Sequence, residues 1–211
     1  MTFTPPDLPL DDERPGAVDA VTRDRTAWIT VLIAALAGIA FTTIQIIDKI
    51  ALLKNPGTGL VCDVNATLSC SGVIEAWQSS ALGPPNALIG AIMFALLGSA
   101  ALAGVLHSTL SRRYLATLWG LAVFFLVFAS WFMYQTAFSI GRLCLWCIGI
   151  TTAVVIICAA LTRIANRAHA FGDGSFGRFV ARTVDAVGDL IFWAAWWALI
   201  ALMVATGLLL A

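Results

Sequence analysis

Charged side chains are scarce in this chain of 211 residues, where Asp, Glu, Lys and Arg together make up only 11%. A soluble domain carries about 25% charged residues, so the composition excludes an ordinary water-soluble globule. The basic residues are also too few and too scattered for a nucleic-acid-binding surface. Apolar residues make up 60% of the chain, which predicts an integral membrane protein.

The N-terminal segment, residues 1–25, lacks the apolar stretch that follows the basic start of a cleaved signal peptide. It is rich in proline and mixes acidic with basic side chains, a composition that buries little apolar surface. We therefore expect a disordered cytosolic tail over residues 1–25.

Five stretches contain no charged side chain and are each long enough to cross about 30 Å of hydrocarbon as a helix. They cover residues 26–47, 86–106, 114–134, 143–162 and 190–211. The predicted fold class is therefore an all-α integral membrane protein. We expect a four-helix transmembrane bundle over residues 26–164, and a cytosolic loop with a fifth transmembrane helix over residues 165–211.

The distribution of basic residues predicts the orientation, because cytoplasmic segments carry an excess of Lys and Arg. One side of the predicted bundle holds nine of them: Arg14, Arg23, Arg25, Arg112, Arg113, Arg163, Arg167, Arg178 and Arg182. The other side holds only Lys49, Lys54 and Arg142. We expect a multi-pass protein of the plasma or inner membrane with a cytoplasmic N-terminus, an outward C-terminus and an outer loop over residues 48–85.

Four of the five cysteines form two close pairs on the predicted outer side, where disulfides are permitted. Cys144 and Cys147 lie at the mouth of the fourth span, where the helix macrodipole favours a thiolate. From spacing alone, this C-x-x-C is as much a redox site as it is one of the alternatives, a structural disulfide or half of a zinc site. A disulfide between Cys62 and Cys70 would close a small loop, while Cys158 lies deeper and is expected only to pack.

The outer loop also contains an apolar segment over residues 71–82. Val73, Ile74 and Trp77 share one side of it, which predicts a short amphipathic helix anchored in the membrane interface by the tryptophan. Such a helix would cap the bundle and hold the loop cysteines over the C-x-x-C pair. The alternative is that the segment is a simple connector.

Two thiol pairs on one membrane face permit a relay of thiol–disulfide exchange. The inner pair then needs an electron acceptor within the bilayer. A quinone is apolar and takes two electrons, the number that a dithiol releases when it becomes a disulfide. A zinc ion held by all four cysteines is the metal alternative, and the unequal spacings of the two pairs argue against it.

Four short motifs follow one another along the chain. They are Cys62-Asp-Val, Ser69-Cys70-Ser71, Asn86-Ala-Leu-Ile-Gly90 and Cys144-Leu-Trp-Cys147. In combination they resemble the vitamin K epoxide reductase (VKOR) family, over about residues 27–163. The resemblance implies the family's four-helix core, here as a bacterial DsbB-like member.

The resemblance also implies roles for individual residues. Cys62 and Cys70 would be the shuttle pair that accepts electrons from a partner, and Cys70 would attack Cys144. Cys147 would face the quinone ring. Asn86 would donate a hydrogen bond to a quinone oxygen and stabilise the charge that develops there. The acceptor would be a menaquinone, ubiquinone or vitamin K type of quinone, with no metal.

Some positions depart from the family pattern. Glu75 and Ala76 occupy the region where family members often carry Ser or Thr, and Thr151 stands where the vertebrate enzyme has a tyrosine. These departures favour quinone reduction over the alternative, vitamin K epoxide reduction. No thioredoxin-like domain follows the fourth span, so we expect a separate DsbA-like protein as the electron donor. A non-enzymatic membrane scaffold with two structural disulfides is the remaining alternative.

Overall fold

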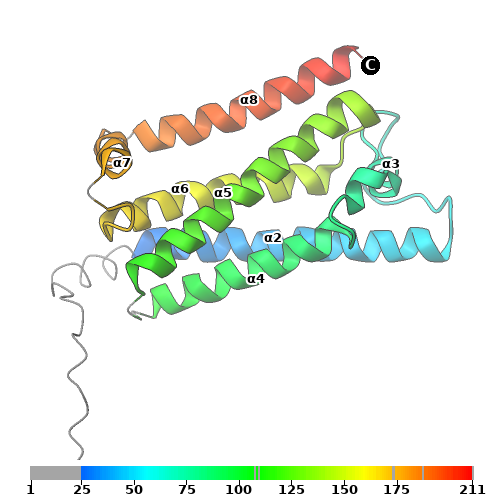
Figure 1. Cartoon of the computed structure of the whole chain (residues 1–211). Helices are drawn as coiled ribbons and strands as arrows, with labels where there is room; N and C mark the ends of the chain where they lie inside the picture. The colour runs from blue at the N-terminus through cyan, green and yellow to red at the C-terminus, as the bar shows by residue number, and fades with distance from the viewer. Residues whose placement is uncertain (1–24, 107, 109, 173, 187, 211) are drawn as a thin grey trace, which may run out of the picture.

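The computed structural model describes residues 25–106, 108, 110–172, 174–186 and 188–210. Within them, five helices are long and apolar enough to cross a membrane, and they lie side by side in a bundle (Figure 1). They are α2 (Arg25–Lys54), α4 (Asn86–Val105), α5 (Arg112–Gln135), α6 (Leu145–Arg167) and α8 (Gly188–Leu210). The predicted all-α membrane fold with a fifth long helix is confirmed. The predicted tail lies outside the described residues, except that Arg25 already belongs to α2.

Helix α6 is the centre of the bundle, because it packs against α2, α5 and α8, while α4 packs along α2. Glycines allow the close approach of α2 and α4, since a Cβ at Gly38 would overlap the ring of Phe94. A Cβ at Gly104 would overlap Trp28 in the same way. Both aromatic rings are fully buried. At each of these two contacts, a glycine on one helix therefore makes room for a large ring on the other.

Helix α2 continues beyond the predicted end of the first span, through Asp48 and Lys49 to Lys54. These two charged side chains do not end the helix, because each finds a partner. The indole Nε1 of Trp146 donates to Asp48 at 3.2 Å, and Lys49 donates to two serine hydroxyls at 3.0 and 2.9 Å. The connection that we call the cysteine loop therefore covers residues 55–85 and not 48–85.

The helix expected over residues 71–82 is present as two shorter pieces, α3 (Cys70–Glu75) and the 3-10 helix η1 (Trp77–Ser80). The chain is extended at Ala76, with φ −63° and ψ 143°, which separates them. The break is stabilised by a serine hydroxyl of η1, which donates to the carbonyl oxygen of Ile74 at 2.6 Å. That carbonyl is thus satisfied without a further helical turn.

The two short helices cover one end of the bundle (Figure 1). Val73 and Ile74 are buried, whereas Trp77 is 69% exposed, as expected for a side chain that anchors at a membrane interface. This division of apolar side chains supports the cap interpretation over a simple connector.

The segment predicted as a loop before the fifth span contains another helix, α7 (Ser175–Asp185). Its apolar residues Phe176, Phe179 and Val180 are spaced by three and four positions, and Phe176 contacts the ring of Trp119 on α5 at a centroid distance of 6.0 Å. This spacing is the signal of an amphipathic helix, and the sequence analysis missed it.

An ion pair joins α8 to the core. Arg163 of α6 donates through Nε and Nη2 to the carboxylate of Asp189, at 2.5 and 3.0 Å, and Asp189 is only 2% exposed. A two-pronged contact of this kind fixes the relative position of the two helices.

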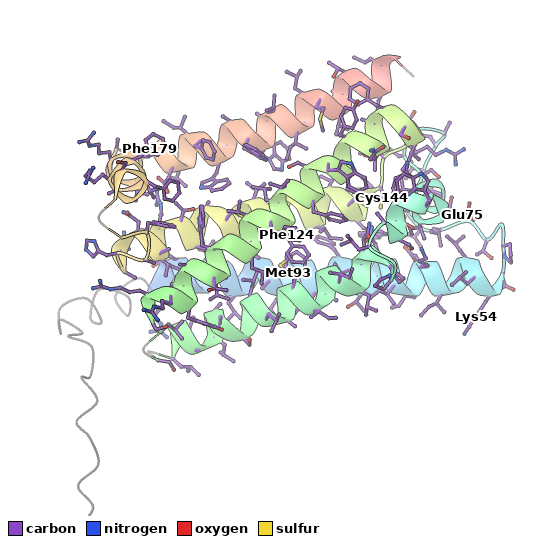
Figure 2. All side chains as sticks on the ribbon, viewed as in Figure 1. Lys54, Glu75, Met93, Phe124, Cys144 and Phe179 are labelled. Carbon is purple, nitrogen blue, oxygen red and sulfur yellow. A yellow bond between two sulfur atoms is a disulfide. The ribbon has the colours of Figure 1, made fainter. Side chains whose placement is uncertain are left out.

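The two ends of the bundle differ in content. Figure 2 shows Cys144 and Glu75 at one end and Phe179 of α7 at the other. We call the first the cysteine end, and the site lies there.

Candidate thiol–disulfide active site

A short parallel backbone bridge joins the cysteine loop to the mouth of α6. The amide of Leu143 donates to the carbonyl oxygen of Thr67 at 2.7 Å, and the amide of Ser69 donates to the carbonyl oxygen of Leu143 at 3.0 Å. A cysteine follows the bridge in each of the two segments. Cys70 comes two residues after Leu68, and Cys144 comes directly after Leu143. The backbone thus brings together two sulfurs from distant parts of the sequence.

The chain reaches this bridge through an irregular end of α5. The helix passes into a π-helical turn, η2 (Thr136–Ile140), and stops at Gly141, whose φ of +68° suits glycine far better than other residues. The chain is then extended at Cys144, which is the N-cap residue of α6 with φ −106° and ψ 123°. The reversal lets Leu143 pair with the cysteine loop before the next helix begins.

All four predicted thiol residues meet in one buried cluster. Cys62 and Cys70 form a disulfide with a Cα–Cα distance of 5.7 Å, and they are 2% and 0% exposed. Cys144 and Cys147 are free and also buried. Sulfurs joined in a disulfide offer no thiolates to a metal, so this pairing does not fit a four-cysteine zinc site. Cys158 is fully buried in the main core cluster, as expected of a packing residue.

Asp63 organises the loop that carries the disulfide. Its carboxylate accepts hydrogen bonds from the amides of Leu60 and Ser71, at 2.9 and 3.0 Å, and from the Ser69 hydroxyl at 3.1 Å. Burial opposes ionisation of this carboxyl group, but the hydrogen bonds outweigh it and hold the pKa of Asp63 below its usual value. The ionised aspartate therefore fixes the loop geometry around both ends of the disulfide.

Gln45 of α2 is a site residue that the sequence analysis missed. Its side-chain Nε2 donates to Cys147 Sγ at 2.9 Å and lies 3.5 Å from Cys144 Sγ. The hydrogen bond from the Cys147 thiol lowers the pKa of Cys144, and Gln45 and backbone amides add to this effect against the opposing effect of burial. Cys144 is thus the thiol that ionises more readily, at the point where the cysteine loop arrives.

A cavity of about 90 Å³ lies beside these thiols, within the bundle and under the cap. Cys147 and Asn86 line it, and Met93, Phe128 and Phe132 are among its apolar walls. Residues of both α4 and α5 form the walls, yet these two helices make little direct contact with each other. The cavity therefore lies at a seam between these two helices.

Asn86 has unused hydrogen-bonding capacity in this cavity. Its Nδ2 donates to the carbonyl oxygen of Gln78 at 2.6 Å, which fixes the orientation of the amide. Its Oδ1 is buried and has no hydrogen-bond partner among the described residues. A side-chain amide has two N–H donors and an acceptor oxygen, so it suits a ligand that presents a carbonyl or hydroxyl group. A quinone carbonyl can accept from the amide N–H, and a hydroxyl of the corresponding hydroquinone can donate to Oδ1, so a quinone and hydroquinone pair fits these features.

Thr151, which stands where the resemblance implies a tyrosine in the vertebrate enzyme, also lines the cavity. Its hydroxyl donates to the carbonyl oxygen of Cys147 at 2.9 Å, within the same helix. Glu75 is exposed at the end of α3 and does not line the cavity. These positions leave Asn86 and Cys147 as the cavity residues that match the predicted acceptor site.

The fold and site together define a helical membrane protein in which a loop disulfide lies against a C-x-x-C pair at the mouth of a helix. The model of the vitamin K epoxide reductase family matches residues 29–162, more than half of the chain. The chain therefore belongs to the vitamin K epoxide reductase family, which confirms the predicted family and supports an oxidoreductase. The DsbB-like subtype stays a prediction. No curated protein sequence matches the chain.

Proposed function

We propose that this protein is a quinone-dependent thiol–disulfide oxidoreductase that drives disulfide bond formation. Electrons pass from a separate DsbA-like protein with a thioredoxin fold to Cys62 and Cys70, then to Cys144 and Cys147, and finally to a quinone. The observation that carries the proposal is the backbone bridge at Leu143, which holds the loop disulfide against the C-x-x-C pair beside an apolar cavity.

The transfer between the two pairs is a sequence of sulfur exchanges. The Cys70 thiolate attacks Cys144 Sγ, a Cys70–Cys144 bond forms, and the Cys144–Cys147 bond breaks with its electron pair passing to Cys147. Cys62 then attacks Cys70 and releases Cys144. The loop pair is oxidised to a disulfide and the helix pair is reduced to two thiols. The pairing in the structure, with the loop pair joined and the helix pair free, corresponds to the end of this transfer.

The last step gives two electrons and two protons to the quinone, which becomes a hydroquinone. Cys147 is the thiol that lines the cavity, so it is the sulfur that faces the ring. In this scheme an Nδ2 hydrogen of Asn86 donates to a ring oxygen and stabilises the negative charge that develops there. The unpartnered Oδ1 accepts from a hydroxyl of the hydroquinone. The aromatic and aliphatic walls exclude water and match the apolar body of the ring.

We further propose that the cysteine end faces the outside of the plasma or inner membrane. Among the described residues, the opposite end carries most of the arginines. They are Arg25, Arg112, Arg113, Arg163, Arg167, Arg178 and Arg182. The excess of basic residues on cytoplasmic segments supports this orientation, with an outward C-terminus.

The test uses the purified full chain in lipid nanodiscs with a soluble ubiquinone analogue and a reduced thioredoxin-fold protein. We expect oxidation of the protein dithiol that depends on the quinone and is lost in Cys147→Ala. Vitamin K epoxide in place of the quinone should support no comparable turnover, and faster turnover with the epoxide would favour the alternative substrate. If both cysteine pairs resist reduction and no quinone is consumed, the proposal fails in favour of a structural scaffold.

A further inference from the structure

Gln45 is the polar side chain of α2 that reaches the reacting sulfurs. Its Nε2 donates to Cys147 Sγ at 2.9 Å and lies 3.5 Å from Cys144 Sγ. The side chain also lines the cavity that Cys147 shares with Asn86. One neutral amide group therefore contacts both thiols of the helix pair and borders the acceptor cavity.

The two nearby basic side chains are directed elsewhere. Lys49, one helical turn beyond Gln45, donates to the hydroxyls of Ser79 and Ser80 at 3.0 and 2.9 Å. Arg142 lies with its side chain against Gly72, where a Cβ would meet it at 2.5 Å. Among the described residues, the Gln45 amide donates to the C-x-x-C sulfurs and neither of these two cations does.

A hydrogen bond to an ionised acceptor is stronger than one to a neutral acceptor, and it is stronger again away from bulk water. Cys147 is only 5% exposed, so little water is present to stabilise charge on its sulfur. The hydrogen bond from Gln45 must therefore strengthen as this sulfur becomes negative. An interaction that strengthens along the reaction accelerates it, whereas one of constant strength does not.

We propose that Gln45 is a catalytic residue of the thiol exchange, which stabilises the Cys147 thiolate as it leaves. When Cys70 attacks Cys144 Sγ, the Cys70–Cys144 bond forms and the Cys144–Cys147 bond breaks. The bonding electron pair passes to Cys147 Sγ, and the Nε2 hydrogen of Gln45 is directed at that atom. The inference rests on the proposed function, because this exchange is one of its steps.

Two substitutions of nearly the same shape test the role. Gln45→Met removes the N–H donors, and Gln45→Glu replaces them with a carboxylate that repels a thiolate. Each is made in a Cys144→Ala/Cys158→Ala background, so that Cys147 is the free thiol, and alkylation by N-ethylmaleimide is followed against pH. We expect the alkylation rate at pH 7 to fall about tenfold in the methionine variant, and further in the glutamate variant.

A second measurement follows the leaving step itself. In a Cys62→Ala/Cys70→Ala background, dithiothreitol reduces the Cys144–Cys147 disulfide directly. We expect this reduction to slow about tenfold with Gln45→Met, because the departing sulfur has lost its donor. The control is Thr30→Val, a half-buried position on the same helix whose hydroxyl donates to the backbone carbonyl of Thr26, and it should change neither rate.

Unchanged alkylation profiles and reduction rates in both Gln45 variants would overturn the inference. Neither assay contains a quinone or a protein partner, so the result does not depend on the proposed function being right. A shifted profile in a protein that reduces no quinone would reject the proposed function and leave the interaction between Gln45 and the thiolate in place.

Discussion

The amide of Ser69 donates a 3.0 Å hydrogen bond to the carbonyl oxygen of Leu143, and this contact ties the cysteine loop to the mouth of α6. The same contact leaves the loop disulfide closed to the surroundings, since Cys62 is 2% exposed and Cys70 is fully buried. A protein that donates electrons to this disulfide must therefore displace the loop before sulfur can meet sulfur. The bridge holds the loop in the position that serves the inner exchange.

Cys147→Ala should abolish quinone reduction, with a fall in turnover of roughly a thousandfold or more, because the sulfur that faces the cavity is gone. The remaining Cys144 thiol can still attack Cys70 and release Cys62, and no Cys147 thiol is left to attack Cys144 and release Cys70. A Cys70–Cys144 disulfide, in exchange with the loop disulfide through Cys62, should be visible by mass spectrometry of the unreduced protein. The matched control is Cys158→Ala, a buried cysteine outside the site, which should retain turnover. Normal turnover in Cys147→Ala would show that another group passes the electrons on.

Asn86→Leu should weaken the reaction with quinone while leaving the exchange between the two cysteine pairs intact. The variant loses both the unpartnered Oδ1 and the N–H donors of the amide, so we expect kcat/KM for the quinone to fall by about 10²-fold. Steady-state kinetics with a soluble quinone analogue measures this effect. Exchange between the pairs, followed without quinone, serves as the internal control. An equal loss in both assays would indicate a structural role for Asn86.

The hydrogen bonds to Asp63 predict that the cysteine loop loosens in acid. The folded pKa of this carboxyl group lies below its ordinary value. The ionised carboxylate of Asp63 therefore stabilises the folded loop above about pH 3.9, and this stabilisation is lost as the pH falls through the folded pKa. Cleavage of the loop by an acid protease should therefore increase steeply at low pH. In Asp63→Ala the loop should be open at neutral pH too, and its cleavage should vary less with pH than that of the wild type.

Loss of the ion pair between α6 and α8 should destabilise the fifth helix. Asp189→Ala removes the buried carboxylate that Arg163 contacts, and we expect a loss of about 2–4 kcal/mol in the free energy of unfolding. Chemical denaturation in detergent measures this loss. The double variant Arg163→Met/Asp189→Leu should recover much of it, because both charges of the ion pair are replaced by apolar side chains of similar size. If the double variant is no more stable than Asp189→Ala, charge pairing is not what holds α8.

The sequence was sufficient to predict the long helices and the cysteine pairs, because both signals are local. A run without charged residues, such as residues 86–106, is sufficient to predict a membrane-spanning helix, and a C-x-x-C motif spans only four residues. The end of α2 was predicted too early for the opposite reason. Asp48 is charged, but its partner Trp146 is distant in sequence, so nothing local shows that the helix can continue past it.

Gln45 is the site residue that could not be identified from the sequence. It lies within an uncharged stretch, and its contacts with Cys144 and Cys147 join segments about a hundred positions apart. Only the packing of α2 against α6 turns this glutamine into a neighbour of the thiols. The helix α7 was missed for a simpler reason, since its amphipathic pattern was present in the sequence but was assigned to a loop.

The loose seam between α4 and α5 bears on which acceptors the site can use. In the proposed reaction, a quinone that arrives through this seam keeps its hydrocarbon tail among the lipids while its ring meets Cys147. The substrate specificity of the site then depends on the ring and its oxygens, and the site accepts quinones with tails of different length equally well. A host that exchanged one isoprenoid length for another would need no compensating change in this protein.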